Sequence, residues 1–381
     1  MSAAAALAPS AHAQTAPAAE SDSHVGYRYN DYSEDAVDGA AIGSPDRYRV
    51  YSQQFQLDTR VGNSGALDVT ATHEVMSGSS PWYVLPGVDG RPIQVLSGAT
   101  IHDHRTALSA AYTADAGTSA STTYSGSYSQ ERDYRATSAG IDRSFPLNAA
   151  LTLGAGGSFS HDIIQPTDYL LYDRVRHEEK NTASVFGSAA WVLDKSSVLQ
   201  TGVQLNVESG YLSDPYKLVS VGDDILADTR PDSRVEAAWL LRYRRAFSDA
   251  NASLHLDYRY AQDSWGVVSH TIDVGWYQSL PDAWQLIPAV RYYSQQQARF
   301  YAPFFLDPGA HQFYSSDYRL GTFGAFSGSI NLRKRLGRWE LSTGIERYHA
   351  TADDALGGAD AAVPGVVSYT RAFIGLDYFL D

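Results

Sequence analysis

The sequence has no cysteine, and lysine is nearly absent, with four residues in a chain of 381. Because disulfides and thiolate metal sites both need cysteine, neither can form. Acidic residues outnumber basic ones, which gives a formal net charge of −14. A broad nucleic-acid surface needs a basic field, so no nucleic-acid partner is expected.

Long apolar runs are also missing. The chain has no stretch of about twenty apolar residues, which excludes a transmembrane helix. This does not exclude a membrane β-barrel, because barrel strands show only alternating hydrophobicity. Tyrosine (26 residues) and glycine (31 residues) are abundant instead. Such a composition without Cys fits two classes: a secreted β-sandwich or β-helix, and an outer-membrane barrel, whose aromatic girdles use Tyr and Trp.

The first residues resemble part of an export signal. Ala11-His12-Ala13 has the form of an A-x-A cleavage site and is followed by Gln14, although a basic n-region is missing and the apolar stretch is short. We therefore expect residues 1–13 to be a signal-peptide remnant and residues 14–23 a flexible N-terminus. The alternative is a disordered Ala-rich tail.

From residue 24 onward the hydrophobic pattern has a period of two, which predicts β-strands. In the stretch 251–261, alternate residues are apolar or aromatic: Leu254, Leu256, Tyr258 and Tyr260. The residues between them are polar: Ser253, His255, Asp257 and Arg259. A helix would scatter both sets around its circumference. We predict that the apolar set faces lipid and that His255, Asp257 and Arg259 face a lumen.

The polar side of these strands favours a barrel over a sandwich. It combines Arg with Asp and Glu, alongside Gly and Ser, as a water-filled or charge-lined lumen requires, whereas the outer side of a sandwich is usually rich in Lys, Thr and Ser. Aromatic pairs near strand ends, Trp239 with Tyr243 and Trp284 with Tyr292, are typical of girdles at two membrane interfaces.

Sixteen segments show this pattern, most of them ten to fifteen residues long, which is enough to cross a bilayer core. They are 24–33, 46–59, 65–75, 99–113, 118–130, 133–144, 149–160, 181–192, 197–208, 233–246, 251–262, 265–279, 284–299, 317–335, 339–350 and 367–380.

The connections alternate between short and long. The short ones are rich in turn residues: 60–64, 114–117, 145–148, 193–196, 247–250, 280–283 and 336–338. The alternate set contains six long loops: 34–45, 76–98, 161–180, 209–232, 300–316 and 351–366; two others, near 131–132 and 263–264, are tight. Short periplasmic turns and long extracellular loops are the layout of an outer-membrane barrel, so residues 24–381 are predicted to form one transmembrane antiparallel β-barrel of about sixteen strands in the bacterial outer membrane.

Several motifs resemble one bacterial family. They are Val95 to Thr100 (VLSGAT), Tyr211 to Lys217 (YLSDPYK), Arg230 to Arg234 (RPDSR), Leu254 to His270 (LHLDYRYAQDSWGVVSH) and Arg291 to Gln295 (RYYSQ). These motifs resemble those of the family catalogued as domain of unknown function 3570. The resemblance runs from 24 to 380 and implies an outer-membrane barrel, but it implies no biochemical activity. Gly375, Tyr378 and Leu380 also resemble, in part, the terminal strand that the barrel insertion machinery recognises.

The inward face of the predicted barrel carries many charges. We expect the lumen to be lined by Arg105, Arg242, Arg244, His255, Asp257, Arg259, Arg291, Glu340, Glu346, Arg347, Arg371 and Asp377. In an open lumen these charges would orient solutes, and in a closed one they would have to form ion pairs.

A sixteen-stranded barrel is too wide for its own side chains to fill. We therefore predict that loop 76–98 or loop 209–232 enters the mouth and narrows it. The expected constriction residues are Asp214, Lys217, Arg230, Asp232 and Arg234. The alternative for this loop is a structure held only by its own Arg–Asp pairs and Pro turns.

Chemistry beyond transport has weaker support. His102 and His104, with Asp103 nearby, and His161 with Asp162, are weak candidates for a metal site at the rim; no metal and no cofactor are expected. Ser264 and His270 could suggest an interfacial hydrolase, but six residues along a strand separate them by about 20 Å, and no G-x-S-x-G elbow is present. We predict no catalytic residues. Trp265 is expected to anchor a hairpin tip at the membrane interface.

Three functions remain open. A channel or export conduit is favoured. The alternative is a structural or assembly barrel that has a filled lumen and docks a partner protein, such as a periplasmic one, through its loops or its periplasmic turns. An interfacial hydrolase is the third. Outer-membrane lipid and the barrel insertion machinery are the expected partners.

Overall fold

The computed structural model describes residues 23–380 apart from 38, 40, 45, 98–100, 115–119 and 360–361. The predicted signal-peptide remnant (1–13) lies outside the described residues, and so does nearly all of the predicted flexible N-terminus.

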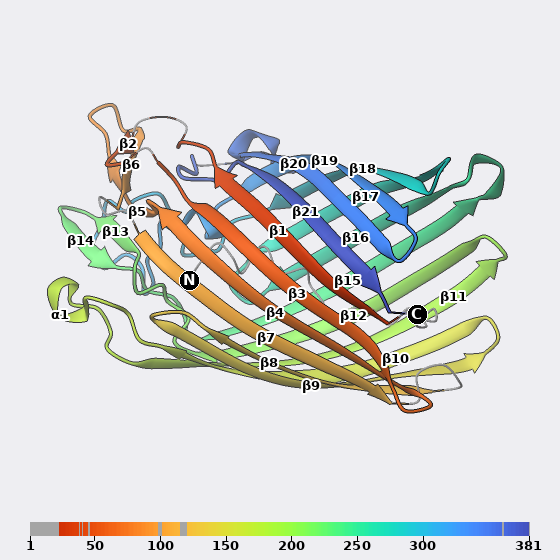
Figure 1. Ribbon diagram of the computed structural model, residues 1–381. Helices are drawn as coiled ribbons and strands as arrows, with labels where there is room; N and C mark the ends of the chain where they lie inside the picture. Colours follow the sequence, from red (N-terminus) through yellow and green to blue (C-terminus); the bar gives the residue numbers. More distant parts are fainter. Residues whose placement is uncertain are drawn as a thin grey trace.

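The predicted sixteen-stranded antiparallel barrel is confirmed. Its strands follow one another around the wall in chain order, and β1 closes the cylinder by pairing with both β21 and β3 (Figure 1). The barrel strands are β1 (His24–Glu34), β3 (Arg49–Val61), β4 (Gly65–Gly78), β7 (Ile101–Ala114), β8 (Ser121–Gln130), β9 (Tyr134–Asn148), β10 (Leu151–Ile164), β11 (Glu178–Asp194), β12 (Ser197–Gly210), β15 (Ser233–Phe247), β16 (Ala252–Asp263), β17 (Val268–Leu280), β18 (Trp284–Gln295), β19 (Phe323–Leu336), β20 (Trp339–Thr351) and β21 (Tyr369–Phe379).

Most strand boundaries lie within four residues of the predicted ones. The clearest exception is β19, which was expected to begin at residue 317 and begins at Phe323. The carboxylate of Asp317 accepts a hydrogen bond from the backbone N–H of Arg319 and caps a short 3-10 helix, Tyr318–Leu320. This cap competes with strand geometry, so the strand starts only after the helix ends.

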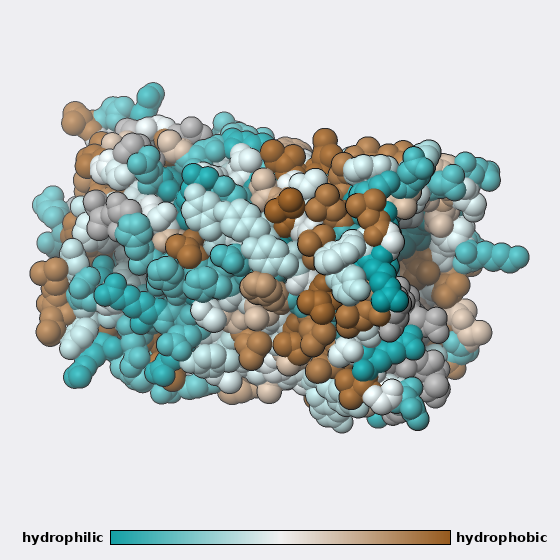
Figure 2. All heavy atoms as spheres, viewed as in Figure 1, coloured by the Kyte–Doolittle hydropathy of each residue, from teal (hydrophilic) through white to brown (hydrophobic). Residues whose placement is uncertain are grey.

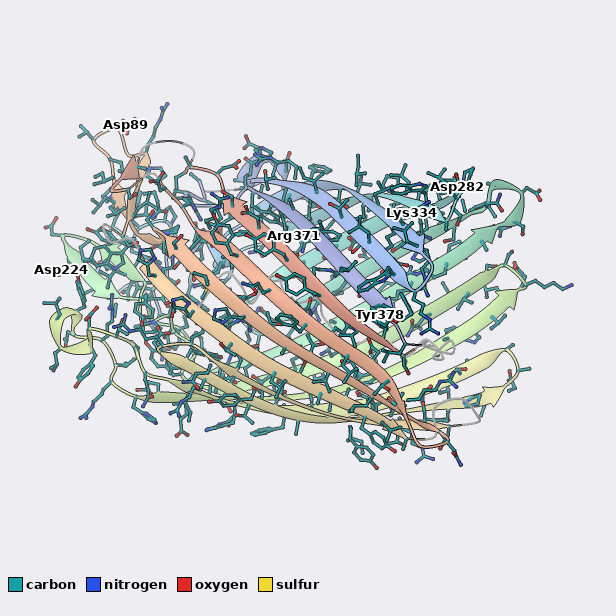
Figure 3. All side chains as sticks on the ribbon, in the orientation of Figure 1. Asp89, Asp224, Asp282, Lys334, Arg371 and Tyr378 are labelled. Atoms are coloured by element: carbon teal, nitrogen blue, oxygen red, sulfur yellow. The ribbon has the colours of Figure 1, made fainter. Side chains whose placement is uncertain are left out.

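The two ends of the barrel differ as the connection lengths predict. Short turns join strands at the end that also holds the C-terminus, and long segments project from the other end (Figure 1). Figure 3 marks these ends with Asp282 and Lys334 on the short-turn side and with Asp89 and Asp224 on the long-loop side. The names short-turn end and long-loop end are used below.

The long loops contain small elements of their own. β2 (Ala41–Ile42), β5 (Pro81–Pro86) and β6 (Pro92–Leu96) form a three-stranded sheet, and β13 (Leu218–Val221) pairs with β14 (Asp224–Ala227). The helical turns are α1 (Tyr169–Tyr172) and the 3-10 helices η2 (Ser248–Ala250), η3 (Tyr318–Leu320) and η4 (Ala352–Asp354). No helix in the described part of the chain is long and apolar enough to cross a membrane.

Apolar side chains are exposed on the outside of the wall. Phe55, Val185, Val203, Ile330 and Ile345 are each more than half exposed. On the face shown in Figure 2, hydrophobic side chains gather toward the short-turn end, while the long-loop end is largely hydrophilic. A band of this kind is unfavourable in water and favourable against lipid.

The largest buried apolar cluster lies among the long loops. It contains Leu212, Trp265, Ala298, Phe300, Tyr301, Leu320 and Val363. Trp265 is only 4% exposed; its ring meets Phe300 edge-on, and its indole N–H donates to the Ser233 carbonyl at 2.9 Å. The prediction that Trp265 anchors the membrane interface is therefore wrong, because the loop that carries Phe300 folds back over the hairpin tip.

Candidate functional site

A row of opposed charges crosses the inner wall over four adjacent strands. Each residue of the row pairs with the next one on the neighbouring strand. The row consists of Arg242 on β15, Asp257 on β16, Asp273 on β17 and Arg291 on β18. Residues that pair directly across a sheet share one face, so the whole row faces the lumen. Arg291 Nε lies 2.6 Å from Asp273 Oδ1, and Arg244 contacts Asp257 through both of its terminal nitrogens.

Other residues predicted to line the lumen also form ion pairs between neighbouring strands. Arg105 lies 2.6 Å from Glu74, Arg259 lies 2.9 Å from Glu236, and Arg371 lies 2.8 Å from Glu346. His255 stacks on Tyr277 with ring centroids 4.0 Å apart. Glu340 and Asp377 stand opposite each other on β20 and β21.

Sequence reasoning missed several acidic partners, namely Glu74, Glu236 and Asp273. It also missed the inward arginines Arg28 and Arg333. Their positions follow from the same period of two, but the register between strands was needed to place them opposite the residues that had been identified.

Arg347 does not line the lumen, contrary to the sequence-based prediction. Its neighbour Glu346 faces inward and pairs with Arg371, whereas the Arg347 guanidinium contacts Asp35 and its side chain is half exposed. Consecutive strand residues point to opposite faces, so Glu346 and Arg347 cannot both face the lumen.

Several of the paired charges on the inner wall remain open to solvent, whereas Glu74 and Glu346 are largely buried. The side chains of Arg291, Asp273 and Arg259 are 52%, 35% and 39% exposed. The inward-facing Arg28 and Arg333 are also exposed. A tightly packed interior would have buried all of these groups.

The inner wall on β8 to β10 carries several small side chains. Ser127 of β8 and Ser138 of β9 face each other and share a hydrogen bond of 2.7 Å. Gly156 of β10 leaves no room for a larger residue, because a Cβ there would lie 2.1 Å from Asp142 Oδ1. The lumen lining is therefore uneven: β15 to β18 carry the row of opposed charges, whereas on β8 to β10 hydroxyl groups and glycines lie beside Asp142.

The long loops meet in a buried charge cluster at the mouth, called here the loop cap. Arg230 lies 2.7 Å from Asp228 in its own loop and 2.8 Å from Asp317 in the loop that precedes β19. Arg319 contacts both Asp214 and Asp317. Burial by itself would raise the pKa of Asp317, but the charges of Arg319, Arg230 and Lys217 hold that pKa well below its usual range.

Two further loops join the loop cap. Lys217 donates to the carbonyl of Pro81, and burial lowers the pKa of Lys217 to about 8. Arg47 pairs with Glu34 at 2.9 Å, with both side chains about 1% exposed. The centre of the Tyr318 ring lies 5.9 Å from the Arg47 guanidinium and 5.5 Å from Lys217 Nζ. Residues from four loops thus form one connected network.

The five residues predicted to form a constriction separate into groups. Asp214, Lys217 and Arg230 belong to the buried network of the loop cap. Arg234 pairs at 2.6 Å with Asp263 at the end of β16, and its guanidinium lies over the Trp265 ring. Asp232 is exposed, and within the described residues it forms no ion pair.

The histidines weighed as metal ligands do not converge. His104 faces the outside of the barrel and stacks on His73, and His102 stands two residues further along the same outer face. His161 lies three strands away and interacts with Asn181 at 2.9 Å. Asp162, which was weighed together with His161, forms an ion pair with Lys180 at 3.2 Å.

A different group has carboxylates close enough to share a cation. Oxygens of Asp103, Glu131 and Asp133 lie within 4.8 Å of one another. Burial raises the pKa of Glu131 to about 7, and the charges of Asp133 and Asp103 add to this effect. Sequence reasoning noted Asp103 only beside the histidines, because the other two carboxylates come from the next hairpin.

The residues weighed as a hydrolase pair have other partners. Ser264 Oγ accepts a hydrogen bond from the Val235 backbone N–H. His270 Nδ1 interacts with the Tyr258 hydroxyl at 2.8 Å on the outer face.

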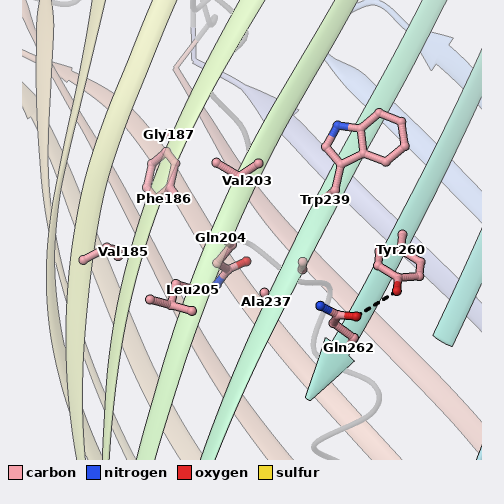
Figure 4. Close-up of a pocket in the computed structure, with 11 residues that line it drawn as sticks. Val185, Phe186, Gly187, Val203, Gln204, Leu205, Ala237, Trp239, Tyr260 and Gln262 are labelled. Atoms are coloured by element: carbon pink, nitrogen blue, oxygen red, sulfur yellow. Dashed lines mark hydrogen bonds between the residues drawn. The ribbon is translucent and has the colours of Figure 1, made fainter. Parts of the chain in front are cut away.

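The outer wall bears a shallow groove of about 420 Å³. Val185, Val203, Leu205, Ala237 and Trp239 supply its apolar lining (Figure 4). At one end the Tyr260 hydroxyl donates to Gln262 Oε1 at 3.0 Å. The apolar lining of the groove belongs to the outer face of β11, β12 and β15.

Solved structures with similar folds include the siderophore receptor PirA from Pseudomonas aeruginosa, at 10% identity and TM-score 0.44, covering 94% of this chain and 62% of that one. CdiB from Acinetobacter baumannii matches at 10% identity and TM-score 0.51, and the match covers 94% of this chain and 60% of CdiB. OccK2 (OpdF) from P. aeruginosa, solved in complex with glucuronate, matches at 10% identity and TM-score 0.43. The match covers 94% of this chain and 98% of OccK2.

This chain spans less than two thirds of the length of the first two structures. At these identities the likeness shows the barrel fold alone. No curated protein is similar in sequence to this chain.

The sequence also matches a family model described as protein of unknown function (DUF3570), over residues 1–378. This agrees with the resemblance seen in the sequence motifs. Because the match covers almost the whole chain, the protein belongs to the DUF3570 family.

Proposed function

We propose that this protein is a channel or export conduit of the bacterial outer membrane, with its short turns in the periplasm and its long loops outside the cell. One observation carries the proposal: the ion-paired side chains of Arg291 and Asp273 on the inner wall are 52% and 35% exposed to solvent. Charged groups that stay hydrated inside a closed wall are what a water-filled passage requires.

The loop cap supports a narrowed passage. Its charged side chains, among them Arg230, Asp317 and Arg319, tie the 211–232 loop to the loop that precedes β19. A folded assembly of this kind at the long-loop end would restrict entry and make the passage selective.

A second function is favoured by the same loop cap. If it seals the mouth, the barrel serves as a structural or assembly element that docks a periplasmic partner. Two partners are proposed in either case. Outer-membrane lipid contacts the apolar outer wall, and the barrel insertion machinery recognises the strand that contains Gly375 and Tyr378.

Conductance in planar lipid bilayers tests the proposal. Purified protein that shifts on a gel after heating, as folded barrels do, should produce discrete current steps in a simple salt solution. Folded protein that produces no current would overturn the channel function and favour the docking barrel.

A further inference from the structure

Two inward arginines share one row of the wall. Arg28 of β1 stands opposite Gly375 of β21, Gly375 stands opposite Ser342 of β20, and Ser342 stands opposite Arg333 of β19. Since directly paired residues share a face, both guanidinium groups project into the lumen from either side of two small residues.

The two residues between the arginines, Gly375 and Ser342, have small side chains. A Cβ on Gly375 would lie 2.5 Å from Ser342 Oγ and 3.5 Å from Arg28 Nε. Ser342 is 3% exposed, and among the described residues its hydroxyl oxygen has no hydrogen-bond partner. Nε of the neighbouring Arg371 is likewise buried without a partner in that part of the chain.

Arg28 and Arg333 differ in charge balance from five other arginines of the inner wall. Arg242, Arg244, Arg259, Arg291 and Arg371 each have a carboxylate within 4 Å. Within the described residues, Arg28 and Arg333 have none, and both are exposed. The Arg28 guanidinium lies 5.1 Å from the centre of the Phe373 ring.

The surrounding charges have both signs. Arg28 is repelled by Arg333 and Arg371 and attracted by Asp377. Asp377 and Glu340 form the next inward pair, two residues toward the short-turn end, or about 7 Å along the strands. A ligand held at the arginines therefore has acceptors for hydrogen bonds close beside it, and these acceptors repel a second negative charge.

We propose that Arg28 and Arg333 form a binding site for the oxyanion group of a small solute, and that the solute is a monocarboxylate carrying hydroxyl or amino donors. The inference rests on the proposed channel and names the class of solute that it admits. The two guanidinium groups bind the carboxylate, the Ser342 hydroxyl lies beneath it, and Asp377 and Glu340 accept hydrogen bonds from the donor groups. Because the same carboxylates repel a dianion, phosphate binds more weakly than a hydroxylated monocarboxylate.

The test compares four proteins in planar bilayers: the wild type, Arg28→Gln/Arg333→Gln, Arg28→Lys/Arg333→Lys, and the matched control Arg143→Gln. Arg143 is exposed on the outer face of β9, so its substitution leaves the lumen unchanged. Gluconate serves as the monocarboxylate probe and inorganic phosphate as the alternative oxyanion. Gel mobility before and after heating establishes that each variant is folded.

In the wild type, gluconate should reduce the chloride current in a saturable manner, and phosphate should do so less strongly. In the glutamine double variant this block should disappear, and the chloride-to-potassium permeability ratio should fall about fivefold, which corresponds to roughly 1 kcal/mol of lost charge interaction. The lysine double variant should keep the permeability ratio but show a weaker block, since lysine cannot bind a carboxylate with two parallel donors. The control should match the wild type.

Unchanged selectivity and unchanged block in a conducting glutamine double variant would overturn the site and leave the channel intact. Equal block by phosphate and gluconate would overturn the preference for a monocarboxylate. If the folded wild type does not conduct, the channel function fails, and calorimetry with gluconate decides the site: binding that the glutamine double variant loses supports it, and absence of binding overturns it.

Discussion

Single ion pairs in this protein fall into two environments. On the inner wall they are partly hydrated, as with Arg291 and Asp273, whereas in the loop cap the side chains of Asp228 and Asp317 are fully buried. Removing one member of a buried pair leaves an uncompensated charge and costs far more than breaking an exposed pair. Substitutions of equal size should therefore have very different effects at the two places.

Asp317 is the residue at which this difference is most easily tested. Asp317→Asn should destabilise the loop cap by about 3–5 kcal/mol, because Arg230 and Arg319 lose a shared carboxylate. Hydrogen exchange of the 211–232 backbone should become faster, while exchange in the barrel strands stays unchanged. Asp232→Asn, at an exposed position in the same loop, is the matched control. Equal exchange rates in the two variants would contradict the importance of the buried network.

Acid should loosen the same cluster. The pKa of Asp317 in the folded protein lies well below its ordinary value of 3.8, so the folded state binds this proton less readily than the unfolded state. Its contribution to stability is complete above about pH 4 and is lost as the pH falls toward the folded pKa. Trp265 emission, taken as the difference between the wild type and Trp265→Phe, should shift to the red below about pH 4. Constant emission down to pH 2, with intact strands by circular dichroism, would show that Asp317 does not hold the loop cap together.

At the scale of one element, a barrel strand has two faces with opposite requirements. On β16, Leu256 stands opposite Tyr243 and Val274, and it is exposed on the outer wall. Its neighbour Asp257 lies in the inward row of charges. The alternation, more than the hydrophobicity of the whole strand, decides which face lipid can cover.

A pair of arginine substitutions tests this assignment. Leu256→Arg should destabilise the barrel by about 2–4 kcal/mol, the cost of placing arginine against lipid near the midplane. Ser127→Arg, at an exposed inward position on β8, should cost little, because the lumen is hydrated. Unfolding by urea in lipid vesicles measures both. A larger loss from the Ser127 substitution would mean that the two faces have been reversed.

At the scale of the whole molecule, the loops decide how open the barrel is. Deleting residues 212–230 removes Asp214, Lys217, Asp228 and Arg230, and with them most of the partners of Asp317 and Arg319. We expect the deletion to raise single-channel conductance while the barrel still shifts on a gel after heating. Deleting only 223–226, at the exposed tip of the β13–β14 hairpin, should leave conductance near the wild-type value. Unchanged conductance in the larger deletion would mean that the loop does not narrow the passage.

The sequence by itself determined the barrel. A period of two identifies each strand and the side chains on its two faces, and turn residues mark where one strand ends and the next begins. Neighbouring strands in a meander also neighbour each other in the chain, so little long-range information is needed. This is why sixteen strands, the alternation of short and long connections, and inward residues such as Asp257 and Arg259 could be predicted.

Only the tertiary structure decided which charges meet. Arg28 and Arg333 lie about 300 residues apart and share one inward row because β1 closes against β21, a contact that no local pattern records. Asp317 was expected at the start of a strand and instead holds Arg230 and Arg319 together, because loops distant in sequence fold over one mouth. Strand periodicity is a local property of the backbone, whereas strand register, barrel closure and loop packing depend on contacts between distant segments. The wall could therefore be predicted from the sequence, and the site within it could not.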